Sequence, residues 1–141
     1  MNLLAPISSI MTKNVIAINP DDNLAMIREI FKNNKIHHLP IVRHKALLGL
    51  ISKHDFDLYV KGLSCQYEDF DDRMVSETLM ESRKVSDFMT EHLAKVESTD
   101  RINVAVEVFK LNRFHALPVV DDGELVGIVT VHDIINTLAK D

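Results

Sequence analysis

Two short stretches of the sequence repeat the same pair of oxygen-bearing side chains. Ser52 and Asp55 stand three residues apart, and so do Thr130 and Asp133. Each hydroxyl lies at the end of a predicted strand, and each carboxylate lies in the first turn of a predicted helix. Helix starts present free amide hydrogens and a partial positive charge, which favour phosphate. A hydroxyl there can donate to phosphate, while a carboxylate can accept hydrogen bonds from ribose hydroxyls. The pattern indicates a nucleotide site.

The same spacing has a second interpretation. A hydroxyl followed three residues later by a carboxylate at a helix start is also typical of a plain capping motif. Because the whole stretch occurs twice, a ligand pocket in at least one copy is favoured, and capping stays open as the alternative.

Basic side chains that could neutralise phosphate are distributed unequally between the two halves of the chain. The first half carries, near its predicted strands, Lys35, His37, His38, Arg43, His44, Lys45, Lys53 and His54. The second half has Arg113, His115 and His132, but at other matching places Ala116, Asp121, Asp122 and Val131. We expect inequivalent pockets whose phosphate contacts come mainly from the first half, with His37, His38 and Lys53 as candidates there and His115 in the second. Arg43, His44 and Lys45 are expected to be solvated.

A unit that occurs twice must position these residues. When the sequence is shifted by 78 positions against itself, the halves align without a gap, and Met11-Thr12 falls on Met89-Thr90. The copies span residues 7–60 and 85–138, with a linker at 61–84. One copy alone cannot easily bury both faces of a short sheet and its helices, whereas two copies can cover each other. We therefore expect an α/β (α+β) fold of two β-α-β-β-α repeats packed with pseudo-twofold symmetry.

Each copy is predicted to contain the same elements in the same order. Apolar residues three and four apart predict a helix from Leu24 and another from Ile102, each preceded by side chains that can cap it. In the first copy an extended stretch at 15–18 precedes the helix, and strands at 39–42 and 47–51 and a second helix near Asp55 follow it. In the second copy the extended stretch is at 93–96, the strands are at 117–120 and 125–129, and the second helix begins near Asp133. The second copy has a strong turn signal at 121–123, which the first copy lacks at 43–45.

The linker carries an acidic cluster at 68–72, followed by a helix-like segment with Met74, Val75, Leu79 and Met80. The favoured interpretation is a solvated connector with one amphipathic helix, and the alternative is a lid or a docking helix.

Composition limits the function classes. The chain has 141 residues, of which 46% are hydrophobic and 26% charged, as in an ordinary globular protein. A net charge of -5 argues against nucleic-acid binding, which requires a basic face. The N-terminus shows no signal-peptide pattern, and no apolar run approaches the roughly 20 residues that cross a bilayer. We expect a cytoplasmic protein with no membrane or nucleic-acid partner.

The histidines and the single cysteine do not form a recognisable catalytic or metal motif. A catalytic metal site needs three or four converging ligands, whereas the His54-Asp55 and His132-Asp133 pairs each follow a short strand. No Gly-rich phosphate loop or nucleophile elbow is present. Cys65 lies in the linker without an obvious activating neighbour. We expect no enzyme activity and no bound metal.

The duplicated motifs resemble those of the CBS domain pair, the Bateman module. In the first copy they are Met11-Thr12, the run 34–42 and the run 49–55; in the second they are Met89-Thr90, 114–120 and 127–133. The run 34–42 is especially similar to one in the gamma subunit of AMP-activated protein kinase. The resemblance implies two clefts between the repeats and sensing of an adenosine derivative, most often AMP, ADP or ATP, without catalysis.

The resemblance also implies roles for individual residues. Residues matching Asp55 and Asp133 bind ribose in the family, and those matching Ser52 and Thr130 contact ribose or phosphate. Adenine would be held by apolar and backbone contacts of the first strand of each copy, near Ile16 and Ala17 or near Ala94 and Lys95.

We therefore expect a regulatory module that binds an adenine nucleotide, requires no cofactor, and signals through a homodimer or an effector protein. The alternative is an interaction or dimerisation scaffold that binds no nucleotide.

Overall fold

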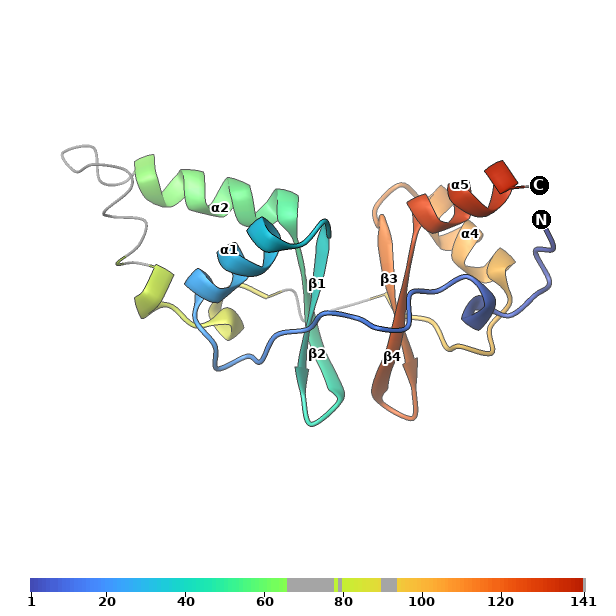
Figure 1. Cartoon of the computed structure of the whole chain (residues 1–141), viewed down its shortest axis with the longest axis horizontal. Coiled ribbons are helices and arrows are strands. Elements are labelled where there is room, and N and C mark those ends of the chain that lie inside the picture. Colours follow the sequence, from blue (N-terminus) through green and yellow to red (C-terminus); the bar gives the residue numbers. More distant parts are fainter. Residues whose placement is uncertain (66–77, 79, 90–93, 141) are drawn as a thin grey trace. The chain divides into compact units, whose positions relative to one another are not determined.

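The computed structural model describes residues 1–65, 78, 80–89 and 94–140. The helices and strands in chain order are α1 (Leu24–Asn33), β1 (His38–Arg43), β2 (Ala46–Ser52), α2 (Lys53–Cys65), α4 (Ile102–Lys110), β3 (Ala116–Asp121), β4 (Glu124–Thr130) and α5 (Val131–Lys140), with 3₁₀ turns at Ile7–Ser9 and Val85–Asp87 (Figure 1). Every element of the second repeat begins 78 residues after its counterpart, as α4 at 102 follows α1 at 24. The predicted mixed α/β fold of two repeats is confirmed.

The chain divides into two compact units that do not coincide with the two repeats. Unit 1 comprises Met1–Ile16, His44–Leu47 and His92–Asp141, and unit 2 comprises Ala17–Arg43 and Leu48–Glu91. The strands follow the order β1-β2-β4-β3, in which neighbours are hydrogen-bonded. The start of β2, which belongs to unit 1, pairs antiparallel with β4 at Ala46 and Glu124.

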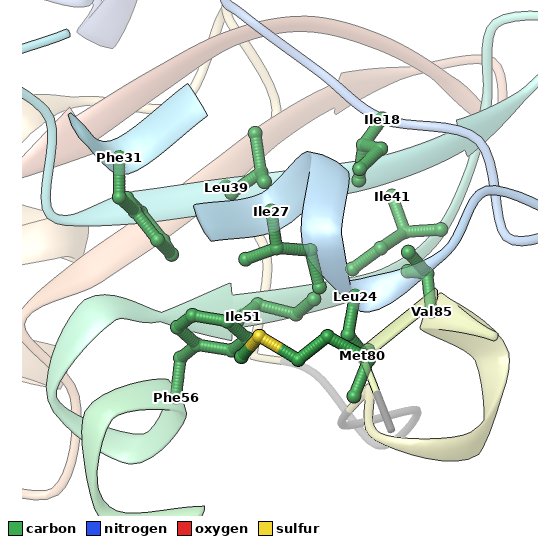
Figure 2. Packing of buried hydrophobic residues seen from close by; sticks show 10 residues of the cluster. All are labelled: Ile18, Leu24, Ile27, Phe31, Leu39, Ile41, Ile51, Phe56, Met80 and Val85. Carbon is green, nitrogen blue, oxygen red and sulfur yellow. The ribbon is translucent and has the colours of Figure 1, made fainter. Parts of the chain in front are cut away.

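Unit 2 is built on one apolar cluster beneath α1. Figure 2 shows its members, which come from the extended segment before α1, from α1, β1, β2 and α2, from the end of the linker and from the 3₁₀ turn after it: Ile18, Leu24, Ile27, Phe31, Leu39, Ile41, Ile51, Phe56, Met80 and Val85. The predicted spacing of apolar residues buries Leu24, Ile27 and Phe31 on one face of α1. The Asn23 side chain caps this helix by accepting a hydrogen bond from the Met26 amide at 3.1 Å, as the sequence predicted.

Unit 1 has its own core around β3 and β4. These strands pair antiparallel from Ala116–Thr130 to Asp121–Glu124, with an irregularity between Val119 and Val120. The buried members of the core are Ile7, Val96, Ala105, Leu117, Val119 and Val129. The capping side chain predicted for the second repeat is wrong: α4 begins without a side-chain cap, because Arg101 occupies the position that Asn23 holds in the first repeat.

The first segment of each repeat packs in the unit formed by the other repeat. The 3₁₀ turn Ile7–Ser9 contributes Ile7 to the core of unit 1, and Thr12 forms a bridge with Ile128 of β4. Conversely, Val85 and Phe88 join the unit 2 cluster, where the Phe88 ring lies 6.0 Å from the Phe56 ring. The two repeats thus exchange their opening segments.

The part of the linker that the structure describes also belongs to unit 2. Helix α2 continues to Cys65, so residues 61–65 are helical. After the gap, Met80 is fully buried in the cluster, and the Leu24 amide donates to the Arg83 carbonyl at 3.1 Å. The acidic cluster at 68–72 and the side chains of Met74, Val75 and Leu79 lie outside the described residues.

The two hairpin turns share one backbone conformation despite different chemistry. Asp122 and Gly123 have φ angles of 52° and 80°, and His44 and Lys45 have 51° and 68°. Two consecutive left-handed residues make the tight turn that matches strand twist. The first repeat therefore forms this turn with two residues that rarely adopt the left-handed region.

Candidate functional site

In unit 1, strand register brings most of the predicted site residues of the second repeat to one end of β3 and β4. Thr130 pairs with Ala116 at the end of the ladder, and the Val131 amide donates to the His115 carbonyl at 3.0 Å. On the other side of β3, Val96 forms a parallel bridge with Val119. Because this pairing is parallel, the residues just before Val96, Ala94 and Lys95, lie toward the same end of β3 as Thr130. We call Ala94, Lys95, His115, Thr130 and Asp133 the second-repeat half-site.

A reciprocal cap joins the hydroxyl and the carboxylate of this half-site. The Asp133 amide donates to Thr130 Oγ1 at 3.1 Å, and the Thr130 amide donates to Asp133 Oδ2 at 2.9 Å. The capping interpretation is therefore confirmed for this pair. The cap uses one carboxylate oxygen only, and Oδ1 has no partner in the part of the chain that the structure describes. Asp133 is half-buried, so its free oxygen is held in a fixed direction beside the first amides of α5.

The corresponding residues of unit 2 form a similar arrangement with a looser cap. The Lys53 amide donates to the His37 carbonyl at 2.8 Å, which matches the bond between Val131 and His115 at the 78-residue offset. The Asp55 amide donates to Ser52 Oγ at 3.1 Å, but within the described ranges the Asp55 carboxylate accepts no hydrogen bond. Asp55 is exposed, whereas Asp133 is half-buried.

The extended segment of the first repeat also lies beside its strand. Ile18 bridges Ile41 in parallel, and its amide donates to the Pro40 carbonyl at 3.0 Å. Ala17 precedes it in unit 2 and is exposed. We call Ala17, His37, Ser52, Lys53 and Asp55 the first-repeat half-site. Ile16 belongs to unit 1, where it is 37% exposed, so it is not placed with this group.

The basic side chains near the half-sites differ in their surroundings. His37 and His115 are both exposed, and Lys53 and His38 are half-buried. Arg43 forms an exposed ion pair with Asp21 at 2.8 Å, while the exposed His44 and Lys45 make up the hairpin turn. The expectation that these last three residues are solvated is confirmed.

Two interactions in unit 1 were not predicted from the sequence. Ser98 donates both its hydroxyl and its amide to the Asp121 carboxylate, the amide at 3.0 Å. These hydrogen bonds, the side-chain one first, lower the pKa of Asp121 below its usual value. Asp121 stands at the position of Arg43, which pairs with Asp21 in the first repeat, so comparing residues 121 and 43 at the 78-residue offset is the signal that could have drawn attention to this contact.

The second missed feature is a close approach at Gly127. A Cβ atom there would lie 2.6 Å from Met11 Sδ and 2.9 Å from the Thr12 carbonyl oxygen. The glycine therefore lets the opening segment of the first repeat pair with β4.

Neither a metal centre nor a membrane span is found in the described ranges. No three His, Cys, Asp or Glu side chains among the described residues gather closely enough to hold a metal ion. Within the same residues, no helix combines the length and the apolar character that crossing a bilayer requires.

Comparison with known sequences identifies both repeats. The sequence model of the CBS domain matches residues 7–62 and 85–140. The chain is 29% identical over 136 residues to a CBS domain-containing protein of Dictyostelium discoideum, covering 95% of this chain and 91% of that protein. It is also 29% identical over 128 residues to inosine-5'-monophosphate dehydrogenase of Thermoplasma acidophilum, covering 90% of this chain. It spans only 22% of the dehydrogenase's length.

Solved structures share the fold. CBSX2 in complex with AMP superimposes with a TM-score of 0.76 at 24% identity, covering 96% of this chain and 97% of CBSX2. The CBS domain pair of MJ0100, in complex with 5'-methylthioadenosine and S-adenosyl-L-methionine, superimposes with a TM-score of 0.72 at 22% identity, covering 97% of this chain and 98% of that one. MJ1225 of Methanocaldococcus jannaschii, an archaeal homologue of the kinase gamma subunit, superimposes with a TM-score of 0.80 at 21% identity, covering 98% of this chain and 49% of MJ1225. At these identities the likeness shows the fold alone.

Matched over both of its repeats by one family, and sharing the fold of solved CBS pairs, this chain belongs to the CBS domain family as a tandem CBS domain pair.

Proposed function

We propose that this CBS pair is a regulatory module that binds an adenosine-containing ligand of the AMP, ADP or ATP type at its half-sites. The ligand changes how the chain associates with a second copy or with an effector protein. The module itself performs no catalysis and requires no cofactor.

The observation that carries this proposal is the free oxygen of the Asp133 carboxylate. The cap with Thr130 fixes the carboxylate through Oδ2 and leaves Oδ1 as an acceptor without a partner among the described residues. A fixed acceptor suits a ribose hydroxyl, because little side-chain freedom is lost when the hydrogen bond forms. The approach of Ala94 and Lys95 to the same end of β3 supports adenine contacts there.

The charges of the two half-sites support binding of different parts of the ligand, phosphate at one and ribose at the other. The first-repeat half-site has Lys53 at the start of α2 and the exposed His37 beside it, which suits phosphate. The second-repeat half-site has Val131 in place of Lys53 and a carboxylate already fixed by its cap, which suits ribose. We propose that the first repeat supplies most phosphate contacts.

The solved relatives support the adenosine part of the proposal. The complexes of CBSX2 with AMP and of the MJ0100 pair with 5'-methylthioadenosine and S-adenosyl-L-methionine share an adenosine group, although their substituents differ in charge. A half-site that recognises ribose and adenine would accept ligands of this class.

A thermal unfolding experiment with AMP, ADP, ATP and S-adenosylmethionine tests the proposal. A ligand at ~100 times its dissociation constant stabilises the folded state by about 2.7 kcal/mol. Asp133→Asn keeps an oxygen for the Thr130 amide but replaces the free acceptor by a donor. We therefore expect Asp133→Asn to lower the ligand-induced shift while leaving the melting temperature without ligand unchanged.

The matched control is Asp57→Asn, an exposed carboxylate on α2 outside both half-sites, which should keep the full shift. Asp55→Asn reports on the first repeat in the same way. If all four ligands leave the melting temperature of the wild-type chain unchanged at millimolar concentration, nucleotide binding is refuted.

The capping geometry favours a second candidate function. Both hydroxyls accept amide hydrogen bonds, so caps account for these residues without any ligand. A dimerisation scaffold that binds no nucleotide would keep these caps and show self-association that no adenosine compound changes.

A further inference from the structure

Helix α1 borders an open groove on unit 2. The groove has a volume of about 420 Å³ and is lined by Asn23, Ala25, Met26, Glu29, Ile30 and Glu81. Three of these lining side chains, Ala25, Met26 and Ile30, are apolar and come from α1, and Met26 is 45% exposed although the opposite face of the helix is buried. An apolar side chain docked against this exposed apolar lining would be removed from water.

Two carboxylates, Glu29 and Glu81, line this groove. Glu29 and Glu81 are both exposed, and neither forms an ion pair within the described ranges. In the second repeat, by contrast, the counterpart of Glu29 is Glu107, which pairs with Lys110 at 3.4 Å. A groove lined by apolar side chains and two carboxylates fits an apolar side chain flanked by cations.

Unit 1 presents such a side chain. Helix α4 ends at Lys110, and Asn112 adopts a left-handed conformation with φ of 56°, which terminates the helix. Leu111, at this end, is 65% exposed, the most exposed of the large apolar side chains the structure describes. Lys110 and the exposed Arg113 flank it, and Arg113 has no partner in the described part of the chain.

The two repeats differ at the positions that form these two features. At the 78-residue offset, Arg101 and Asn103 stand where the groove has Asn23 and Ala25, and Asn33 stands where the second repeat has Leu111. The first repeat thus lacks the exposed leucine of the second, and the second lacks two of the residues that line the groove of the first. A twofold pair of chains can join the two features, because each copy then gives its leucine to the groove of the other.

We propose that two copies of this chain associate with Leu111 of each copy in the α1 groove of the other, and with Lys110 and Arg113 facing Glu29 and Glu81. The proposal rests on the self-association included in the proposed function and assigns its contact. Salt should weaken this association, because the flanking charges are exposed.

Charge reversal on the full-length chain tests the contact by analytical ultracentrifugation. Glu29→Lys/Glu81→Lys places cations on both sides of the contact, and Lys110→Glu/Arg113→Glu places carboxylates on both. Each variant alone should raise the dissociation constant by about tenfold or more. An equimolar mixture should restore wild-type affinity, because both contacts of the mixed pair then join opposite charges.

Leu111→Asn, which copies the residue of the first repeat, should weaken association, whereas Leu58→Asn, at an exposed leucine of α2, should not. Circular dichroism with thermal melting checks that each variant is folded. If the charge reversals leave the dissociation constant unchanged, or if mixing the two variants does not restore affinity, the proposed contact is refuted, although the chain still self-associates. A wild-type chain that stays monomeric at millimolar concentration overturns both, while the ligand-induced shift in melting temperature is read independently.

Discussion

The pairing of residues 11–12 with β4 predicts that Gly127→Ala destabilises the fold. The added Cβ would lie 2.6 Å from Met11 Sδ and 2.9 Å from the Thr12 carbonyl oxygen. Met11 can move its flexible side chain, but Thr12 is held by two backbone hydrogen bonds with Ile128, at 2.9 and 3.0 Å. The chain must either accept the overlap or lose these bonds.

The overlap and the loss of the two hydrogen bonds would lower the free energy of unfolding by similar amounts. Overpacking of a tight site costs about 1–3 kcal/mol, and two hydrogen bonds contribute about 1 kcal/mol each. We therefore expect Gly127→Ala to lower the free energy of unfolding by about 2 kcal/mol. At about 4 °C per kcal/mol for a chain of this size, the melting temperature should fall by about 8 °C.

Gly62→Ala is the matched control for this experiment. Gly62 lies inside α2, and nothing stands within 4 Å of the Cβ that alanine would add. Alanine should stabilise this helix by about 0.5–1 kcal/mol, so the two substitutions have opposite signs. Urea unfolding of both variants gives the free energies. A Gly127→Ala variant as stable as the wild type would refute the placement of residues 11–12 against β4.

Three other substitutions test separate contacts. Lys45→Gly should stabilise the chain by about 1 kcal/mol in urea unfolding, because Lys45 holds a left-handed conformation, and Gly123→Ala should lower stability by a similar amount; equal stabilities would refute the turn assignment. The hydrogen bonds from Ser98 lower the folded-state pKa of Asp121, so their stabilisation is present above the unfolded pKa of about 3.9 and is lost as pH falls through the lower folded value. Ser98→Ala should therefore lower the urea midpoint at pH 6 more than at pH 2, and a loss independent of pH would contradict the linkage. Asp133→Ala removes the cap and should lower the free energy of unfolding by about 1 kcal/mol, whereas Asp133→Asn should leave it unchanged, as measured by thermal melting without ligand.

The order of the elements could be predicted from the sequence because each repeat carries its own local signals. Apolar residues three and four apart mark the buried face of α1, and Asn23 marks its start. The constant offset of 78 residues then transfers each assignment to the second copy. These signals are short-range, since they depend on helix periodicity and on capping within one turn.

The exchange of opening segments could not be predicted in this way. Ile7 and Val85 are apolar residues at matching positions, and either would fit the core of either repeat. The glycines do not distinguish the partners either, because Gly49 and Gly127 also stand at matching positions, and a glycine in a strand does not name the residue that approaches it.

The hydroxyl and carboxylate pairs show a similar limit. The spacing of Thr130 and Asp133 predicted either a cap or a ligand site, and the structure contains the cap. The two roles share the same atoms except for one carboxylate oxygen, which is why the spacing alone could not separate them. The same holds for Ser52 and Asp55, whose cap is made by the hydroxyl only.

The most direct test of the proposed function is a titration of the ¹⁵N-labelled chain with AMP, followed by the backbone amide resonances. We predict saturable shifts at Thr130 and Asp133 and at Ala94 and Lys95, with those at 130–133 diminished in Asp133→Asn. Amide resonances that stay in place throughout the titration to millimolar AMP, or that move only at positions remote from both half-sites, would contradict the account.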